Sequence, residues 1–442
     1  MTPNPAIMQA VEHLGYRVTP GDIAAQAGMD IKLAEQGLLA LASDAGGHLQ
    51  VSETGEIAYL FPTNFRGVLR SKFLRLRLQD WGRKIWNALF YLIRISFAIL
   101  LIASIVLIVV TIALILIAMN SSSSDGDRRS DSRGSAIVIP RLWLPYNWYG
   151  VFSPGYRQQR HQYKSQHDRS ASNAEKNQMN FFEAVFSFLF GDGNPNADLE
   201  ERRWQAIATI IRNHRGAIVA EQVAPYLDNV DQGDCEEFEA YMLPVLTRFN
   251  GRPEVSPEGH LVYHFPELQV MAAENQPRPV AAYLKESLWQ FSQATSGQMM
   301  LAAGLGVVNL VGAIWLGILL ADGAIAAQMG GLVAFVSSIY GVLLAYGIGF
   351  LAVPLVRYFW LKLRNVRVSA RNLARQQRAE ALNQGREALQ QKLAYARQFA
   401  LEVVVDQESL AYTTETDLAE QEYLKANQID AEWQQRLERQ GK

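Results

Sequence analysis

Three long apolar runs divide the 442-residue chain, and polar stretches lie before, between and after them. Residues 95–119 contain no charged side chain. At a rise of about 1.5 Å per residue, a helix of that length crosses a hydrocarbon layer about 30 Å thick. Two further runs, at about 299–321 and 332–356, are joined by a short glycine-containing turn. A soluble core helix is rarely apolar on every face over such a length, so the pattern predicts one spanning helix and a helical hairpin over 299–356.

Small residues recur at helical spacing in both helices of the hairpin. Small side chains four residues apart let two backbones approach closely, which is the main source of helix association in lipid. The residues expected at this contact are Ala313, Gly317, Ser337, Gly341, Ala345 and Gly349. A transport path would instead need buried ionisable residues, and Asp322 lies at the turn, where a capping role is simpler.

Basic residues flank the first and the last apolar run. The stretch 63–94 combines cations with tryptophans and predicts an amphipathic helix on the membrane surface. The residues expected to meet lipid there are Arg66, Arg70, Lys72, Arg75, Arg77, Arg83, Lys84, Trp81 and Trp86. Because basic flanks stay on the cytoplasmic side, both flanks are expected there, together with an N-terminus that lacks a signal-peptide pattern. Such a placement needs an even number of crossings, so the count stays open, with 137–152 and 181–198 as interfacial or re-entrant candidates.

Residues 1–62 predict a small module of three helices and a two-stranded hairpin. Thr19 and Asp22 mark a helix start, because threonine caps the first amides and an acid suits the positive end of the helix dipole. Gly28 ends that helix, and Gly55 marks the turn of the hairpin. Three short helices followed by a two-stranded wing form the order of a winged helix.

The same order of elements is expected in residues 199–268. Residues 51–62 and 255–266 agree at six positions with a constant offset of 204, and the match falls at the same place in two similar helix patterns. Pro244 departs from the pattern, because proline should kink the third helix of the second copy. The sequence therefore predicts two related winged-helix-like modules.

Charge favours protein partners for these modules over nucleic acid. A helix that reads DNA needs lysine or arginine for phosphates and base edges. The third helix of the first module offers Lys32 against Glu35 and Asp44. The acids before and within the start of the third helix of the second module are Asp228, Asp231, Asp234, Glu236, Glu237 and Glu239. DNA would be repelled, so we expect no nucleic acid partner.

The sequence offers no complete calcium motif. The segment from Asp192 to Asp198 alternates oxygen-bearing side chains as a calcium loop does. However, Ala197 stands where that loop needs glycine, and Arg203 stands where it needs glutamate. A capped loop before the next helix is the simpler interpretation.

Other catalytic and metal motifs are also missing from the sequence. His260 and His264 lie on a predicted strand, where side chains four apart stand about 13 Å from each other, too far to share a metal. Cys235 is the single cysteine, which excludes a disulfide or a multi-thiolate site within one chain. Its acidic neighbours should raise the pKa of its thiol rather than activate it. We therefore expect no catalytic residue, no metal and no cofactor.

The remaining segments are polar connections. Residues 120–180 form a low-complexity linker around the aromatic segment 137–152, and 269–298 connects the second module to the hairpin. Residues 357–442 begin basic, continue with mixed charge, and predict a helical tail with a coiled-coil contact as one option.

Four stretches carry a resemblance to a known family. They are VEHLGYRVTPGDIAAQAG, AEQGLLALASDAGGHLQVSETGEIAYLFP, FFEAVFSFLFGDGNPNADLEERRW and GGLVAFVSSIYGVLLAYGIGFLAVPLVRYFW. The sequence resembles a membrane protein family of cyanobacteria and plant chloroplasts over nearly its whole length. Plant members bear the label iron-sulfur cluster biosynthesis family protein, which implies no site residue here; with Cys235 alone, one chain cannot hold a cluster. The resemblance implies a thylakoid or plasma membrane of an oxygenic phototroph.

These features predict an α-helical integral membrane protein with two small α+β winged-helix-like soluble modules and a helical C-terminal tail. The expected function is that of a non-enzymatic scaffold or assembly factor. It would bind proteins through the modules and membrane lipids through its basic flank, in the biogenesis of photosynthetic or iron-sulfur membrane complexes. A membrane-tethered transcription regulator is the first alternative, and a small-solute transporter or channel is the second.

Overall fold

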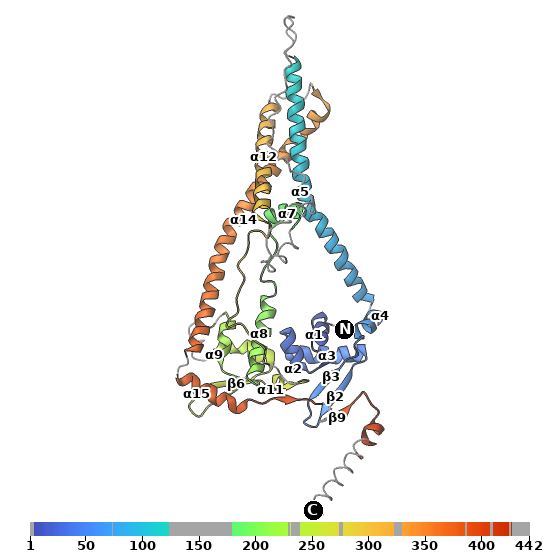
Figure 1. Ribbon diagram of the computed structural model, residues 1–442, viewed down its shortest axis with the longest axis vertical. Helices are drawn as coiled ribbons and strands as arrows, with labels where there is room; N and C mark the ends of the chain where they lie inside the picture. The colour runs from blue at the N-terminus through green and yellow to red at the C-terminus, as the bar shows by residue number, and fades with distance from the viewer. Residues whose placement is uncertain are drawn as a thin grey trace, which may run out of the picture. The chain divides into compact units, whose positions relative to one another are not determined.

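The computed structural model is mostly helical and divides into two compact units (Figure 1). The structure describes residues 4–72, 74–122, 179–228, 230, 239–273, 277–321, 329–384, 387–406, 410–423 and 426. One unit, called here the module unit, comprises Met1–Gly82, Pro195–Ser287 and Arg367–Lys442. The other, called the membrane unit, comprises Arg83–Asn194 and Leu288–Val366. The aromatic segment 137–152 lies outside the described residues.

Three helices of the described chain are long and apolar enough to cross a membrane. They are α5 (Leu74–Ser122), α12 (Ser296–Leu320) and α14 (Gly331–Asn383), and they cover the three predicted apolar runs. Thr295 starts α12 with a capping box to Gln298, which satisfies amides that a helix end leaves free. The fourth apolar helix, α7 (Phe181–Phe190), is too short to span a bilayer alone.

The apolar parts of the three long helices lie side by side (Figure 1). One buried cluster joins α5, α7, α12 and α14 through residues such as Leu101, Phe188, Ala302 and Phe350. The Ser104 hydroxyl donates a 2.8 Å hydrogen bond to Oδ1 of Asn309, which is 1% exposed. Such polar contacts between helices add to van der Waals packing, which holds helices together in lipid.

The hairpin packs through a different face of α14 from the one expected. Ala313 is fully buried and Gly317 lies under the ring of Tyr340, as the small-residue pattern of α12 suggested. In α14, however, Gly341 and Gly349 have no neighbouring atom within 4 Å of a Cβ position. The side chains of Ser337 and Ala345 are half-buried and exposed, respectively. The face of α14 that meets α12 carries Tyr340, Gly347 and Phe350, and Phe350 lies over Gly306. The small residues of α12 thus receive large aromatic rings rather than a second row of small residues.

The first module of the module unit has the predicted three helices and hairpin, and a short strand that was not predicted lies between the first two helices. Its helices are α1 (Pro5–His13), α2 (Pro20–Ala27) and α3 (Ile31–Ala45), and its strands are β1 (Arg17–Val18), β2 (His48–Ser52) and β3 (Ile57–Leu60). Thr19 and Asp22 cap each other's backbone amides, and Gly28 ends α2 in the left-handed conformation. The three strands pair in the order β1-β3-β2. The capping residues therefore set both ends of α2 where the sequence predicts them.

The second module repeats this order with a shorter middle helix. Its elements are α8 (Leu199–Asn213), β4 (Ala217–Ile218), α9 (Ala220–Val223), α10 (Leu243–Phe249), β5 (Arg252–Val255) and β6 (Leu261–His264). Its strands pair in the order β4-β6-β5. The expected kink at Pro244 is wrong, because Pro244 lies in the first turn of α10, where a missing amide costs no hydrogen bond. Asp234 and Glu237, expected to start this helix, lie outside the described residues.

Corresponding residues of the two modules make the same contacts. The Phe61 amide donates to the Tyr16 carbonyl at 2.8 Å, and the Phe265 amide donates to the Gly216 carbonyl at 2.8 Å. Further pairs in equivalent places are Ser52 and Ser256 at the hairpin turn, Gly55 and Gly259 with positive φ, and Gly46 and Asn250 in the left-handed conformation. The offset of 204 therefore extends through the third helix, whereas β1 and β4 are 200 residues apart. The offset between the modules therefore changes from 200 to 204 residues between the second and third helices.

The C-terminal tail is only partly helical. After α14 it forms α15 (Glu387–Ala396) and then the strands β8 (Val403–Val404) and β9 (Leu410–Thr413). Strand β8 pairs with β7 (Val270–Met271), and β9 pairs antiparallel with β2 of the first module (Figure 1). The helix expected across 357–442 thus gives way to strands where β-branched and aromatic residues gather. Helix α15 packs on β4 and β6 of the second module rather than in a coiled coil.

Candidate functional site

The two modules share one hydrophobic core, which fixes which of their surfaces stay free. Buried residues of α1, α2 and α3 form a single cluster with those of α8 and α10. Arg212 of α8 pairs with Asp22 at 2.8 Å, and Asp22 also accepts a hydrogen bond from the Ala272 amide at 3.1 Å. Gly21 lies against the Glu267 carbonyl, where any side chain would collide with backbone. Helix α2 is therefore covered within the unit.

The third helices, α3 and α10, are covered on one side only. On α3, Leu33 is 61% exposed and Leu39 is 55% exposed, and they lie on either side of exposed Gln36. On α10, Leu243 is 65% exposed. Leu39 and Leu243 are equivalent residues at the offset of 204, and Leu38 and Met242 beside them are both fully buried. Each module thus presents a leucine from the same point of its third helix.

Few cations on these third helices are free to meet phosphate. Lys32 of α3 is exposed. Arg248 of α10 lies over the Trp204 ring, 4.1 Å from its centroid, and donates to the Gly28 carbonyl at 2.6 Å. Burial lowers the pKa of this guanidinium, opposed by the charges of Glu200 and Asp30. The one arginine of α10 therefore holds the two modules together.

Part of the acidic charge expected at the second module is internal. Glu239 accepts hydrogen bonds from the Tyr263 hydroxyl at 2.8 Å and from Lys392 of α15 at 2.9 Å. Burial, with Glu239 as a further cause, raises the pKa of Tyr263. Lys392 also pairs with Glu221 at 2.8 Å. Asp231, Asp234, Glu236 and Glu237 lie outside the described residues, so the exposed acidity of this region stays a prediction.

A buried charge cluster fixes the C-terminal part of α14 in the module unit. The Arg375 side chain is 2% exposed, pairs with Asp228 and with Glu286 at 2.9 Å, and donates to the Leu284 carbonyl at 2.9 Å. Arg371 makes two hydrogen bonds to Glu286, at 2.8 and 2.6 Å. Arg203 of α8 completes the cluster through Asp228. The sequence pattern did not indicate this cluster, because Arg371 and Arg375 were counted only as part of the basic flank after the last apolar run.

Acid should weaken this charge cluster. The hydrogen bond from Arg371 is the main cause that lowers the pKa of Glu286, and it outweighs burial. Burial raises the pKa of Asp228, but Arg375 and Arg203 together lower it below its usual value. A carboxyl group whose pKa is lower in the folded protein than in the unfolded chain stabilises the fold at pH values above its pKa in the unfolded chain. That stabilisation is lost as the pH falls through the pKa in the folded protein.

We therefore expect the urea concentration at the unfolding midpoint of the full-length protein in detergent to decrease when the pH is lowered below about 4. Glu286→Gln should make the midpoint less dependent on pH, because the titrating group is removed. The matched control is Glu258→Gln, at an exposed turn of the second module, which should leave the dependence unchanged. Equal pH dependence in wild type and Glu286→Gln would contradict the assigned role of Glu286.

The structure describes the side chains of four of the nine predicted lipid-binding residues. Arg66 lies in α4 (Phe65–Lys72) and pairs with Glu12 of the first module. Trp81, Lys84 and Trp86 are exposed on α5. The side chains of Arg70, Lys72, Arg75, Arg77 and Arg83 lie outside the described part of the structure. A basic surface along α5 therefore stays a prediction.

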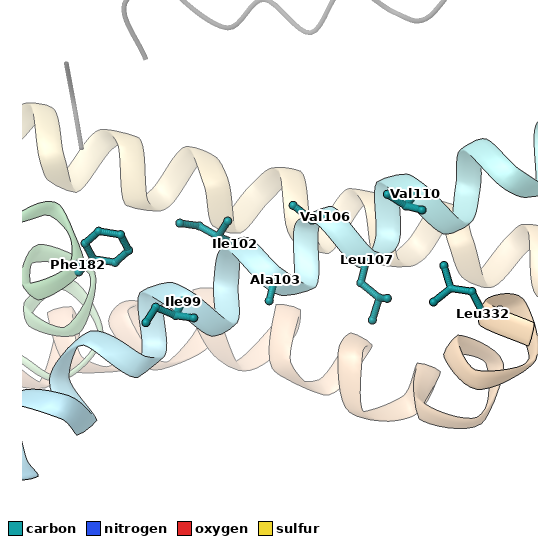
Figure 2. A pocket seen from close by; sticks show the side chains of 8 residues that line it. All are labelled: Ile99, Ile102, Ala103, Val106, Leu107, Val110, Phe182 and Leu332. Atoms are coloured by element: carbon teal, nitrogen blue, oxygen red, sulfur yellow. The ribbon is translucent and has the colours of Figure 1, made fainter. Parts of the chain in front are cut away.

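The membrane unit contains an open groove lined by apolar side chains (Figure 2). It has a volume of about 590 Å³. Its lining comes from α5, from α7 and from the start of α14: Ile99, Ile102, Ala103, Val106, Leu107, Val110, Phe182 and Leu332. With no polar side chain to act on a substrate, this surface suits contact with lipid chains.

The rejected calcium segment has a structural role. Asp192 accepts hydrogen bonds from the Ser187 hydroxyl at 2.6 Å and the Gln293 amide at 2.8 Å, and it pairs with Arg94 at 3.1 Å. Among the described residues, no group of three or more His, Cys, Asp or Glu side chains could hold a metal ion.

Comparison with known proteins identifies one extensive likeness. No protein-family model matches the chain, and no solved structure matches it. The chain is 37% identical over 434 residues to an uncharacterised chloroplastic protein of Arabidopsis thaliana, covering 94% of this chain and 79% of the relative. The relative's name makes no mention of iron–sulfur clusters, so the label implied by the resemblance gains no support. The chain belongs to the same family as this chloroplastic protein of Arabidopsis thaliana.

Proposed function

We propose that this protein is a membrane-anchored, non-enzymatic scaffold that binds other proteins through the third helices of its paired modules. The observation that carries the proposal is the equivalent exposure of Leu39 and Leu243 on α3 and α10. A leucine that is more than half exposed at one such position needs no explanation. The same residue at the same point of two modules, each beside a fully buried neighbour, favours a shared binding role.

We further propose that both modules are winged helices that arose by duplication. The equal strand orders β1-β3-β2 and β4-β6-β5 and the matched hairpin turns support this proposal. In a helix-turn-helix protein the corresponding helix enters the major groove with its basic residues. Here that helix carries leucine, and Arg248 is committed to Trp204 and Gly28, which favours a protein partner over DNA.

A plastid membrane is the proposed location. The relative is chloroplastic, and three helices of this chain can span a bilayer. A scaffold without chemistry of its own suits the assembly of membrane complexes, and photosynthetic or iron–sulfur complexes are the proposed clients. The thylakoid is the proposed membrane, with the modules on its stromal side.

The proposal is tested by quantitative affinity capture of the full-length protein from plastid membranes in mild detergent. Leu39→Asp combined with Leu243→Asp should lower recovery of the bound partner about tenfold or more, because apolar interface anchors contribute about 2 kcal/mol each. Gln9→Asp places the same charge on an exposed residue of α1 and should leave recovery unchanged. Equal recovery by wild type and the double variant would remove the basis for binding through the third helices.

A further inference from the structure

Helix α14 extends its apolar surface beyond Val356, where its uncharged run ends. Five exposed residues follow on this helix: Tyr358, Phe359, Trp360, Leu363 and Val366. Tryptophan and tyrosine are enriched where a spanning helix meets the lipid headgroups. Arg364 lies four residues after Trp360, about 6 Å further along the helix axis. Where α14 crosses a bilayer, the guanidinium group of Arg364 therefore lies at the level of the lipid headgroups.

Two tryptophan rings hold the Arg364 side chain. Its guanidinium carbon lies 3.9 Å from the centroid of the Trp289 ring and 5.0 Å from that of the Trp360 ring. The two rings are 6.1 Å apart and nearly perpendicular, at 76°. Asn365 fixes Trp289 through both of its backbone groups, with hydrogen bonds of 2.8 and 2.9 Å. The position of the guanidinium is thus set before any ligand arrives.

The hydrogen-bond donors of Arg364 remain unused within the described part of the chain. None of the described carboxylates pairs with it, and no described acceptor takes a hydrogen bond from it. Arg357, seven residues earlier on α14, does use its hydrogen-bond donors. Arg357 also lies over an aromatic ring, 4.3 Å from the centroid of Phe291, but it donates to the carbonyls of Ser187 and Phe291. Arg94, near the Phe186 ring, pairs with Asp192 at 3.1 Å.

We propose that Arg364, Trp289 and Trp360 form a binding site for the phosphate or sulfonate group of an anionic membrane lipid. The rings supply no hydrogen-bond acceptor, so contact with them leaves the N–H edges of the guanidinium available. Those edges form a fork that matches two oxygens of a tetrahedral oxyanion. The tryptophan rings, which favour the boundary between headgroups and acyl chains, would flank the glycerol part of the same lipid.

The test uses purified full-length protein in detergent, with phosphatidylglycerol and phosphatidylcholine added together. Native mass spectrometry then counts the lipids that each variant retains. Wild type should retain phosphatidylglycerol preferentially, and Arg364→Gln should lower that retention about tenfold or more, because hydrogen bonds to charged groups contribute about 1.5–3 kcal/mol. Lys362→Gln is the matched control, since it removes an exposed charge two residues away that is not stacked on a ring, and it should leave retention unchanged.

Arg364→Lys keeps the test decisive if the glutamine variant cannot be purified. Lysine preserves the charge but offers no fork, so a partial loss of retention is expected. Equal losses in Arg364→Gln and Lys362→Gln would overturn the proposal, because they would indicate general charge attraction. Full retention by Arg364→Lys would overturn it as well. Displacement of the lipid by inorganic phosphate at equal concentration would assign the site to free phosphate instead.

Discussion

Replacing Arg375 with alanine is expected to lower the free energy of unfolding of the module unit by about 3 kcal/mol. Arg375 is almost completely buried between Asp228 and Glu286, so its removal leaves two carboxylates with less compensation. Losing one partner of a buried ion pair costs about 3–5 kcal/mol, and the lower end applies here because Arg203 and Arg371 stay in place. Pulse proteolysis of the full-length protein in urea measures the loss.

Arg367→Ala is the matched control for this measurement. Arg367 is exposed on the same helix, and such surface substitutions usually change stability by less than about 0.5 kcal/mol. Combining Arg375→Met with Glu286→Gln should recover part of the loss, because Arg375 and its buried partner Glu286 are then removed together. A loss in Arg375→Ala no greater than that in Arg367→Ala would show that the buried cluster does not stabilise the unit.

Replacing Phe265 or Phe61 with alanine should cost about 3–5 kcal/mol in each case. Phe265 is fully buried against Gly251, and Phe61 is buried against Gly47 at the equivalent point of the first module. Both substitutions leave a large cavity beneath the hairpin of their module, where the surrounding core can relax only in part. Urea unfolding of the full-length protein, followed by pulse proteolysis, compares the two variants.

Equal costs for the two phenylalanines would indicate that the modules are built alike. Val255→Ala, on the exposed side of the second hairpin, is the matched control and should cost less than about 0.5 kcal/mol. A large cost at Phe61 together with a negligible cost at Phe265 would contradict the equivalence of the modules.

Helices and hairpins whose positions depend on residues close together in the chain could be predicted from the sequence. The apolar runs define α5, α12 and α14, because a single segment satisfies all of its own backbone groups in lipid by forming a helix. Thr19, Asp22 and Gly28 set both ends of α2 as expected. The match of 51–62 to 255–266 correctly located two hairpins with the same register. In each case the physical cause lies within a few residues of the signal.

Contacts between distant residues were harder to predict. The small residues Gly341 and Gly349 suggested a packing face, but no atom lies within 4 Å of a Cβ position at either glycine. Tyr340 and Phe350 determine which face of α14 packs against α12, because each ring fits over a glycine of α12. Strand β9 gave no local signal of its partner, because β2 lies about 360 residues earlier in the chain.

The arginine face of α14 carried a signal that was not used. Arg357, Arg364, Arg371 and Arg378 recur every seven residues, which places them along one side of a helix. Counted only as positive charge, they indicated a membrane flank. Their spacing indicates a helix face with partners, and the structure provides those partners from residues that precede the hairpin, including Glu286 and Trp289.

Binding through the third helices is tested most directly by site-specific photo-crosslinking in intact native membranes. A photoreactive amino acid replaces Leu39 or Leu243 in the full-length protein, and exposed Gln9 in the control. If the third helices bind proteins, positions 39 and 243 each give a discrete crosslinked product that position 9 does not give. No product at either leucine position, or the same product at position 9, would contradict binding through these helices.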